Sequence, residues 1–212
     1  MLMEVLEYGK KNAETVLLQM VDDNDLKTME QEVALIRENA GEDFRLLACR
    51  VRDWNLCLSP WKAPAVFGRQ DFGGGAEDTL RELMDICPEN AKICYIGGYS
   101  LAGLFALWAA YQADRFQGVA AASPSMWFPG FTEYMRAHEL HCGNIYLSLG
   151  DKEEKARNPV MATVGDRIRE ADLLLREQGK NCILEWNQGN HFQDAGVRTA
   201  KAFSWVMRQE VR

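Results

Sequence analysis

The chain has 212 residues, of which 47% are hydrophobic and 26% are charged, and its formal net charge is −7. This length predicts a single domain over residues 1–212. No apolar segment approaches the ~20 residues of a membrane span, and the N-terminal residues do not resemble a secretory leader, so we expect a cytoplasmic globular protein that does not bind membranes. Because Lys and Arg are not clustered in a stripe, we also expect no binding to nucleic acid.

Apolar, strand-like runs alternate with helical patterns along the chain. The predicted strands cover residues 14–21, 44–51, 91–99, 116–124, 144–150 and 182–187. The helical patterns cover residues 25–40, 76–87, 101–112, 160–178 and 194–209, with a short segment at 131–140. Because the strands are continuous apolar runs rather than alternating ones, they predict a mostly parallel sheet with helices on both faces, which is the doubly wound α/β class.

One connection, residues 53–75, is long and unpatterned, and such a loop in a compact domain is typical of a functional site. It ends in the triple glycine 73–75, which lacks the Lys-Ser/Thr ending of a phosphate-binding loop. The six cysteines are dispersed without the paired spacing of a zinc site. We therefore expect reduced thiols and neither a metal nor an organic cofactor.

Ser100 lies between a predicted strand and a predicted helix, in the sequence Gly98-Tyr99-Ser100-Leu101-Ala102. An abrupt turn from strand to helix strains the residue at its apex and requires small residues two positions before and after it, as Gly98 and Ala102 are. The N–H of Leu101, at the start of the helix, is placed to bind an oxyanion. Ser100 is therefore a candidate nucleophile, and the alternative is that its side chain only caps the helix.

His191 is the candidate base for this serine. It follows the last predicted strand, and α/β-hydrolases carry their catalytic residues in the chain order Ser, acid, His. The other two histidines, His138 and His141, flank a polar connection where a surface histidine is the ordinary case.

The acid is expected in the loop after the strand at 144–150. Three acidic residues qualify there: Asp151, Glu153 and Glu154. Glu153 is preferred because many hydrolases place the acid three residues past the glycine that ends the strand, here Gly150, and Asp151 is the alternative. The cluster could also be a solvated loop in which Lys152 and Lys155 pair with the acids.

Three segments carry a family resemblance: GGYSLAGLFAL, the later AASPSMWF, and NHFQD before the last helix. Together they resemble the esterase family of α/β-hydrolases that includes S-formylglutathione hydrolases, siderophore esterases and mycolyltransferases. The resemblance covers most of the chain from Phe44 onward and is greatest to small bacterial esterase-like members. It implies an α/β-hydrolase fold without a large cap domain.

The same resemblance implies roles for individual residues. Ser100 becomes the nucleophile, His191 the base, and the acid lies within GDKEE, although some relatives work with a Ser–His dyad alone. The loop after the strand at 44–51 is implied to supply the second N–H of the oxyanion hole, near Trp54 or Asn55.

Aromatic and hydroxyl residues near the carboxyl ends of the strands are candidates for a substrate pocket. The predicted pocket residues are Tyr99, Trp61, Ser125 and Trp127. Aromatic walls would suit an apolar or aromatic acyl group, whereas ordinary core packing is the alternative for each tryptophan.

The sequence thus predicts a serine hydrolase that cleaves a carboxylic ester or thioester through an acyl-enzyme intermediate. Its expected partner is a small-molecule ester, and a homodimer stays open. Two alternatives keep the same fold: an acyltransferase on the same triad, and a binding module without turnover.

Overall fold

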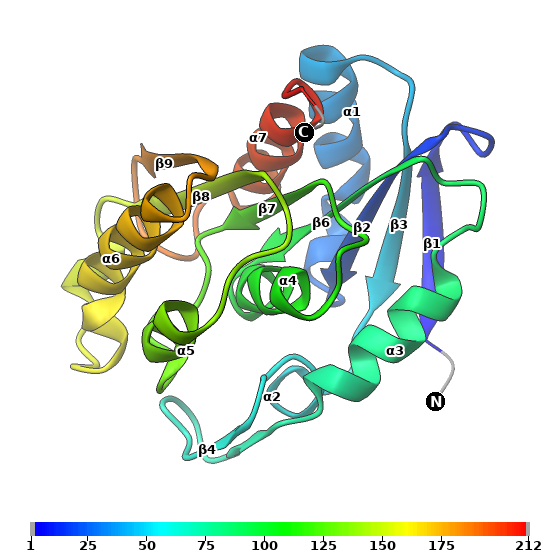
Figure 1. Ribbon diagram of the computed structural model, residues 1–212. Coiled ribbons are helices and arrows are strands. Elements are labelled where there is room, and N and C mark those ends of the chain that lie inside the picture. The colour runs from blue at the N-terminus through cyan, green and yellow to red at the C-terminus, as the bar shows by residue number, and fades with distance from the viewer. Residues whose placement is uncertain (1–2, 211–212) are drawn as a thin grey trace.

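Seven strands form one sheet in the computed structural model, which describes residues 3–210 (Figure 1). The strands are β1 (Glu4–Gly9), β2 (Thr15–Val21), β3 (Arg45–Arg50), β6 (Ile93–Tyr99), β7 (Gly118–Ala122), β8 (Asn144–Gly150) and β9 (Asn181–Asn187). Their order across the sheet is β1-β3-β2-β6-β7-β8-β9, and only β1 runs antiparallel to its neighbour. The mostly parallel α/β architecture predicted from the sequence is confirmed.

Helices cover both faces of this sheet (Figure 1). On one face lie α1 (Met29–Ala40) and α7 (Ala195–Met207), whose apolar side chains share a core with β2 and β3. On the other face lie α3 (Ala76–Ile86), α4 (Leu101–Gln112), α5 (Phe131–Ala137) and α6 (Val164–Glu177). The chain also contains three single-turn 3-10 helices: η1 (Asp25–Lys27), η2 (Glu153–Lys155) and η3 (Met161–Thr163).

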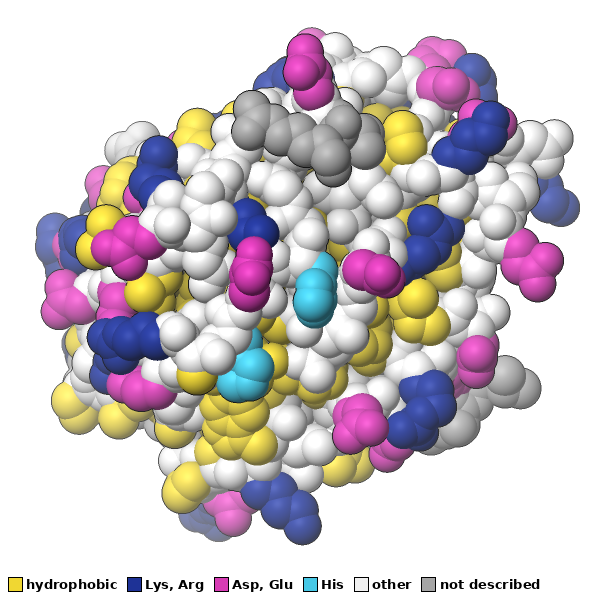
Figure 2. Space-filling model, in the orientation of Figure 1, with side chains coloured by type: hydrophobic (Ala, Val, Ile, Leu, Met, Phe, Trp, Pro, Cys, Tyr) yellow, Lys and Arg dark blue, Asp and Glu magenta, His cyan; other side chains and the backbone are white. Residues whose placement is uncertain are grey.

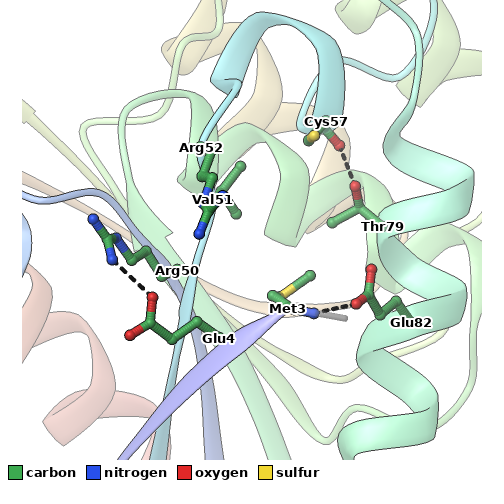
Figure 3. A pocket seen from close by; sticks show the side chains of 8 residues that line it. All are labelled: Met3, Glu4, Arg50, Val51, Arg52, Cys57, Thr79 and Glu82. Atoms are coloured by element: carbon green, nitrogen blue, oxygen red, sulfur yellow. Dashed lines mark hydrogen bonds and ion pairs between the residues drawn. The ribbon is translucent and has the colours of Figure 1, made fainter. Parts of the chain in front are cut away.

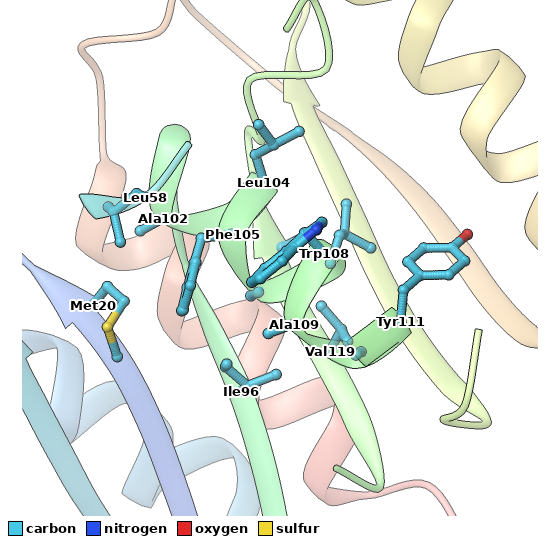
Figure 4. Close-up of a cluster of buried hydrophobic side chains, with 14 of the residues drawn as sticks. Met20, Leu58, Ile96, Ala102, Leu104, Phe105, Trp108, Ala109, Tyr111 and Val119 are labelled. Atoms are coloured by element: carbon cyan, nitrogen blue, oxygen red, sulfur yellow. The ribbon is translucent and has the colours of Figure 1, made fainter. Parts of the chain in front are cut away.

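Helix α4 is apolar on every side, and all of its residues except Gln112 are buried. Such a helix belongs inside a protein rather than at its surface. Figure 4 shows Phe105 and Trp108 of α4 packed among side chains of the strands, including Ile96 and Val119. Each buried aromatic side chain of this kind contributes about 2–3 kcal/mol, so the helix that follows Ser100 is firmly anchored.

The loop at 53–75, predicted without regular structure, contains the short helix α2 (Trp54–Cys57) and a small hairpin of β4 (Lys62–Ala63) and β5 (Phe72–Gly73). The first strand, β1, was also not predicted. Its sequence EVLEYG mixes charged and apolar residues because it lies at the sheet edge, where Glu4 and Glu7 pair with Arg50 and Arg45 of β3 at 2.7 and 2.8 Å.

The surface carries both signs of charge. Acidic and basic side chains are interspersed over the face shown in Figure 2. Between residues 3 and 210, no helix combines the length and the apolar character needed to cross a membrane.

Candidate active site

Ser100 lies at the sharp turn between β6 and α4. Its backbone has φ 58° and ψ −121°, a region that residues other than glycine rarely adopt. Its N–H donates to the carbonyl of Ala122 and its own carbonyl accepts from the N–H of Ser125, both at 3.1 Å. A Cβ atom on Gly98 would lie 2.7 Å from the Cβ of Ala102. The turn is therefore held by hydrogen bonds and needs the small residues that flank it.

The side chain of Ser100 does not cap the helix. Although Ser100 occupies the N-cap position of α4, its hydroxyl makes no capping hydrogen bond. Its Oγ lies 2.9 Å from Nε2 of His191, and Nδ1 of His191 lies 2.7 Å from Oε2 of Glu153. With Glu153 ionised, Nδ1 carries the proton and donates to it, which leaves Nε2 as the acceptor for the serine hydroxyl.

Three parallel strands bring these residues together. Ser100 follows β6, Glu153 lies in η2 just after β8, and His191 lies in the loop after β9. The carboxyl ends of parallel strands meet at one edge of the sheet, where α/β proteins place their sites.

Of the three candidate acids, the structure places only Glu153 against His191. Asp151 instead accepts a hydrogen bond from the N–H of Gly189 at 2.8 Å, and Glu154 pairs with Arg169 at 2.9 Å. Among the ion pairs of the described residues, none involves Lys152 or Lys155, so a loop of mutually paired charges does not describe this segment.

Glu153 is buried, with 6% of its surface exposed, and both of its oxygens are hydrogen-bonded. Its Oε1 accepts from the N–H of Gly150 at 2.7 Å, the hydroxyl of Ser123 at 2.8 Å and the guanidinium of Arg198 at 2.9 Å. Burial alone would raise the pKa of Glu153, but the hydrogen bond and charge of His191, together with the Gly150 and Ser123 donors, lower it below its usual value. The carboxylate is therefore kept ionised beside the imidazole.

Arg198 is a residue of this site that the sequence analysis missed. It is 1% exposed, and besides Glu153 it donates to the carbonyls of Gln188 and Asn190, both at 3.1 Å, and to the hydroxyl of Tyr99 at 3.1 Å. One guanidinium thus binds the acid and fixes the loop that leads to His191. The sequence could have indicated this position, because Arg198 precedes Ala202 by four residues and Val206 by eight. This helical spacing places the arginine on the buried side of α7.

A cavity of about 430 Å³ opens beside His191. Its lining residues are Ser123, Pro124, Trp127, Lys152, Glu153, Lys155, Ala156, Arg157, Met161, Val164, Asn190, His191 and Phe192. Of the residues predicted to form the substrate pocket, Trp127 lines this cavity, and Ser125 places its hydroxyl 3.3 Å from that of Ser100.

The other two predicted pocket residues, Tyr99 and Trp61, do not line this cavity. Tyr99 belongs to the core on the α1 and α7 face, and its hydroxyl donates to the carbonyl of His191 at 2.8 Å. Trp61 packs on the rings of Phe128 and Tyr134, and its indole N–H donates to a carbonyl. Their sequence positions next to loops did not reveal the direction of the side chains.

The residues expected to form an oxyanion hole lie at two helix starts. Leu101 is the first residue of α4, so its N–H has no partner within the helix. Trp54 and Asn55 open α2, which is capped by Asp53 accepting from the N–H of Leu56 at 3.0 Å. The Asn55 side-chain amide donates one N–H to the carbonyl of Gln70 at 3.0 Å, and the indole N–H of Trp54 is buried without a hydrogen-bond partner among the described residues. The backbone N–H groups of Trp54 and Asn55 lie in the first turn of α2, where they have no partner within the helix.

A second cavity, of about 120 Å³, lies near the first strand, and none of Ser100, Glu153 and His191 lines it (Figure 3). Two pairs of its polar groups bind each other, since Arg50 pairs with Glu4 and the N–H of Met3 donates to Glu82. Within the described part of the chain, no group of three His, Cys, Asp or Glu side chains is arranged to hold a metal ion.

No model of a known protein family matches the sequence, and no curated protein matches it either. Solved structures do share its fold. An IroE-like serine hydrolase from Shewanella oneidensis is similar with a TM-score of 0.76 and 12% sequence identity, over 96% of this chain and 75% of that chain. The siderophore hydrolase EstA from Aspergillus nidulans has a TM-score of 0.67 and 17% identity, over 97% and 94% of the two chains.

A carboxylesterase from Bacillus cereus is similar with a TM-score of 0.63 and 15% identity, over 96% of this chain and 93% of that chain. At these identities the similarity establishes the fold. The chain therefore has the α/β-hydrolase fold, and the solved structures named here are serine hydrolases and esterases, the group that its sequence resembles.

Proposed function

We propose that this protein is a serine hydrolase that cleaves carboxylic esters or thioesters through an acyl-enzyme intermediate. The observation that carries the proposal is the continuous hydrogen-bonded chain from Ser100 through His191 to Glu153, with distances of 2.9 and 2.7 Å. Nucleophile, base and orienting acid within hydrogen-bond reach are the arrangement that serine catalysis requires. The fold shared with known esterases adds support.

In the first half-reaction, Oγ of Ser100 attacks the carbonyl carbon of the substrate while Nε2 of His191 takes the hydroxyl proton. The tetrahedral intermediate then collapses, the bond to the leaving oxygen or sulfur breaks, and His191 returns the proton to that atom. In the second half, water gives a proton to His191 and attacks the carbonyl carbon of the acyl-enzyme. The bond between that carbon and Oγ then breaks, His191 returns the proton to Oγ, and the acid is released from the restored Ser100. Glu153 stays ionised and stabilises the imidazolium in both halves.

The negative charge of the tetrahedral intermediate requires hydrogen-bond donors. The N–H of Leu101, at the positive end of the α4 dipole, is one proposed donor. A backbone N–H at Trp54 or Asn55 is the proposed second donor.

Labelling with a fluorophosphonate probe tests this proposal, with the adduct located by peptide mass spectrometry. We expect an adduct on Ser100 in the wild-type protein and none in Ser100→Ala. His191→Ala should also lose the adduct and should lower kcat for 4-nitrophenyl acetate by roughly 10³-fold or more. The exposed histidine His138 supplies the control, because His138→Ala should label and turn over like wild type. Equal rates in the wild type, Ser100→Ala and His191→Ala would overturn the assignment.

A further inference from the structure

The cavity beside His191 is lined by three cationic side chains: Lys152, Lys155 and Arg157. All three are exposed, and no ion pair between described residues involves any of them. The only carboxylate in the lining is that of Glu153, and its oxygens are already bound by His191 and Arg198. The chain as a whole has 31 acidic and 24 basic residues, so this local excess of positive charge runs against its overall balance.

The nearest acids in the sequence do not neutralise this rim. Asp151 is directed to the N–H of Gly189, and Glu154 pairs with Arg169, which does not line the cavity. A cleft lined by one sign of charge over an apolar wall focuses the electric field and attracts ligands of the opposite sign.

The remaining wall of the cavity is largely apolar. Trp127, Met161 and Val164 lie on it, together with Phe192, which is 89% exposed next to His191. A ligand that fits both parts has an apolar or aromatic body and an anionic group at one end.

We infer that the ester cleaved at this site carries an anionic group, which Lys152, Lys155 and Arg157 bind while the apolar body of the substrate packs against Trp127 and Phe192. The inference rests on the proposed function, since the acyl transfer itself is assigned to Ser100 and His191. Carboxylate and phosphate share the required chemistry: the planar fork of Arg157 binds two oxygens of either group, and each lysine adds a point charge.

Matched pairs of esters that differ in one charge test the inference. The first pair, 4-acetoxybenzoate and methyl 4-acetoxybenzoate, carries the charge on the leaving group. The second pair, phenyl hydrogen adipate and phenyl hexanoate, carries it on the acyl group, and 4-acetoxyphenyl phosphate replaces the carboxylate by a phosphate. The measured quantity is the ratio of kcat/KM for the anionic ester to that for its neutral partner, corrected for spontaneous hydrolysis.

For the wild type we expect a ratio above one in at least one pair, which falls as salt is added because the rim is exposed and screened. In the triple variant Lys152→Gln/Lys155→Gln/Arg157→Gln, the ratio should fall by about 20- to 100-fold, since each charge a few ångströms away in water is worth up to about fivefold. The single variant Arg157→Glu should lower the ratio further than Arg157→Gln, because a like charge repels the substrate.

Lys11 supplies the control. It is an exposed lysine in the turn between β1 and β2. This turn lies at the amino end of β2, whereas Ser100 lies at the carboxyl end of the parallel strand β6, so the two residues are at opposite edges of the sheet. Lys11→Gln should therefore keep the wild-type ratio. An unchanged ratio in the triple variant, or a wild-type preference for the neutral esters in both pairs, would overturn the inference. Absence of turnover for every ester would instead count against the proposed function, so the two failures are distinguishable.

Discussion

Arg198 connects two parts of the site through one side chain. Its guanidinium holds Glu153 at 2.9 Å and binds the backbone carbonyls of Gln188 and Asn190, so the acid and the loop that carries His191 share one anchor. Because the arginine is buried, with 1% of its surface exposed, its action on the chemistry runs through its contacts with Glu153 and with the loop that carries His191. Arg198 is accordingly a positioning residue.

Replacing Arg198 by methionine should remove both functions while leaving a side chain of comparable length. We expect kcat/KM for 4-nitrophenyl acetate to fall by about 10²-fold, because a misplacement of about 1 Å has that effect. The free energy of unfolding should fall by about 3 kcal/mol, because the buried carboxylate of Glu153 loses its ion pair with the arginine. Loss of the positive charge also favours proton uptake by the Glu153–His191 pair, so the acidic limb of the pH–rate profile should move to higher pH.

Arg198→Lys separates charge from geometry. Lysine supplies the charge but lacks the fork that reaches two carbonyls and a carboxylate at once. We expect the acidic limb to return towards its wild-type position while kcat stays lowered. If Arg198→Met loses stability but retains the wild-type pH profile and kcat, the residue has only a structural role.

The difference between Ser100 and Arg198 shows what could be predicted at this scale. Ser100 and His191 stand in a local sequence context that the chemistry itself requires, so they could be identified without coordinates. The choice of Glu153 among three acids, and the inward direction of Arg198, depend on how η2 and α7 dock against the sheet. The same dependence explains why the sequence did not reveal that Tyr99 and Trp61, which were predicted as pocket residues, do not line the cavity beside His191.

At the scale of elements, helix α1 carries an ionisable group that its docking has removed from water. Glu32 lies on the buried side of α1 and is 2% exposed, and its Oε1 atom has no hydrogen-bond partner among the described residues. Burial, with a smaller contribution from the charge of Asp25, raises the pKa of Glu32 to about 8. The protonated form is therefore the one that suits the interface between α1, α7 and the sheet.

This pKa shift predicts how stability depends on pH. In the unfolded chain the pKa of Glu32 is near its ordinary value of 4.5, so between pH 4.5 and about 8 the folded state binds the extra proton. Its contribution to stability is complete below pH 4.5, is lost as the pH rises towards 8, and changes no further above that. Glu32→Gln should remove this loss and raise the free energy of unfolding at pH 8.5 by on the order of 5 kcal/mol relative to wild type, given about 1.4 kcal/mol per unit of pKa.

Urea unfolding at pH 5 and pH 8.5 measures this effect. Glu30 provides the matched control, since it lies in the same first turn of α1 but is exposed, and Glu30→Gln should change the stability by less than about 0.5 kcal/mol at either pH. If the stability of Glu32→Gln falls with rising pH as steeply as that of the wild type, another group is responsible for the loss.

The elements themselves were largely predictable, because long apolar runs and helical periodicity survive in the folded protein. The predicted helix at 101–112 is α4, and the strand at 144–150 is β8, each with the same bounds. β1 escaped prediction because a half-exposed edge strand has no continuous apolar run. The short elements within 53–75 are too brief for any period to be read from the sequence.

At the scale of the whole molecule, the two apolar cores lie on opposite faces of one sheet and share its strands. Residues of β2 and β6 alternate between them: Leu18 and Ile96 face the α4 core, whereas Leu17 and Tyr95 face the core of α1 and α7. Loss of either helical layer therefore exposes strands on which the other layer depends. The candidate site also draws on both layers, with Ser100 at the start of α4 and the positioning residue Arg198 on α7.

The shared strands predict that the chain unfolds as a single domain. Urea transitions followed by tryptophan fluorescence and by far-UV circular dichroism should coincide, with one midpoint and one slope. Hydrogen exchange should give the most protected amides of α4 and of α7 the same opening free energy, within about 1 kcal/mol, because both open only in global unfolding. An early transition that exposes α1 and α7 while α4 stays protected would divide the chain into two cooperative units. Esterase activity would then disappear with the first of them, because the anchor of Glu153 lies on the helix that is lost.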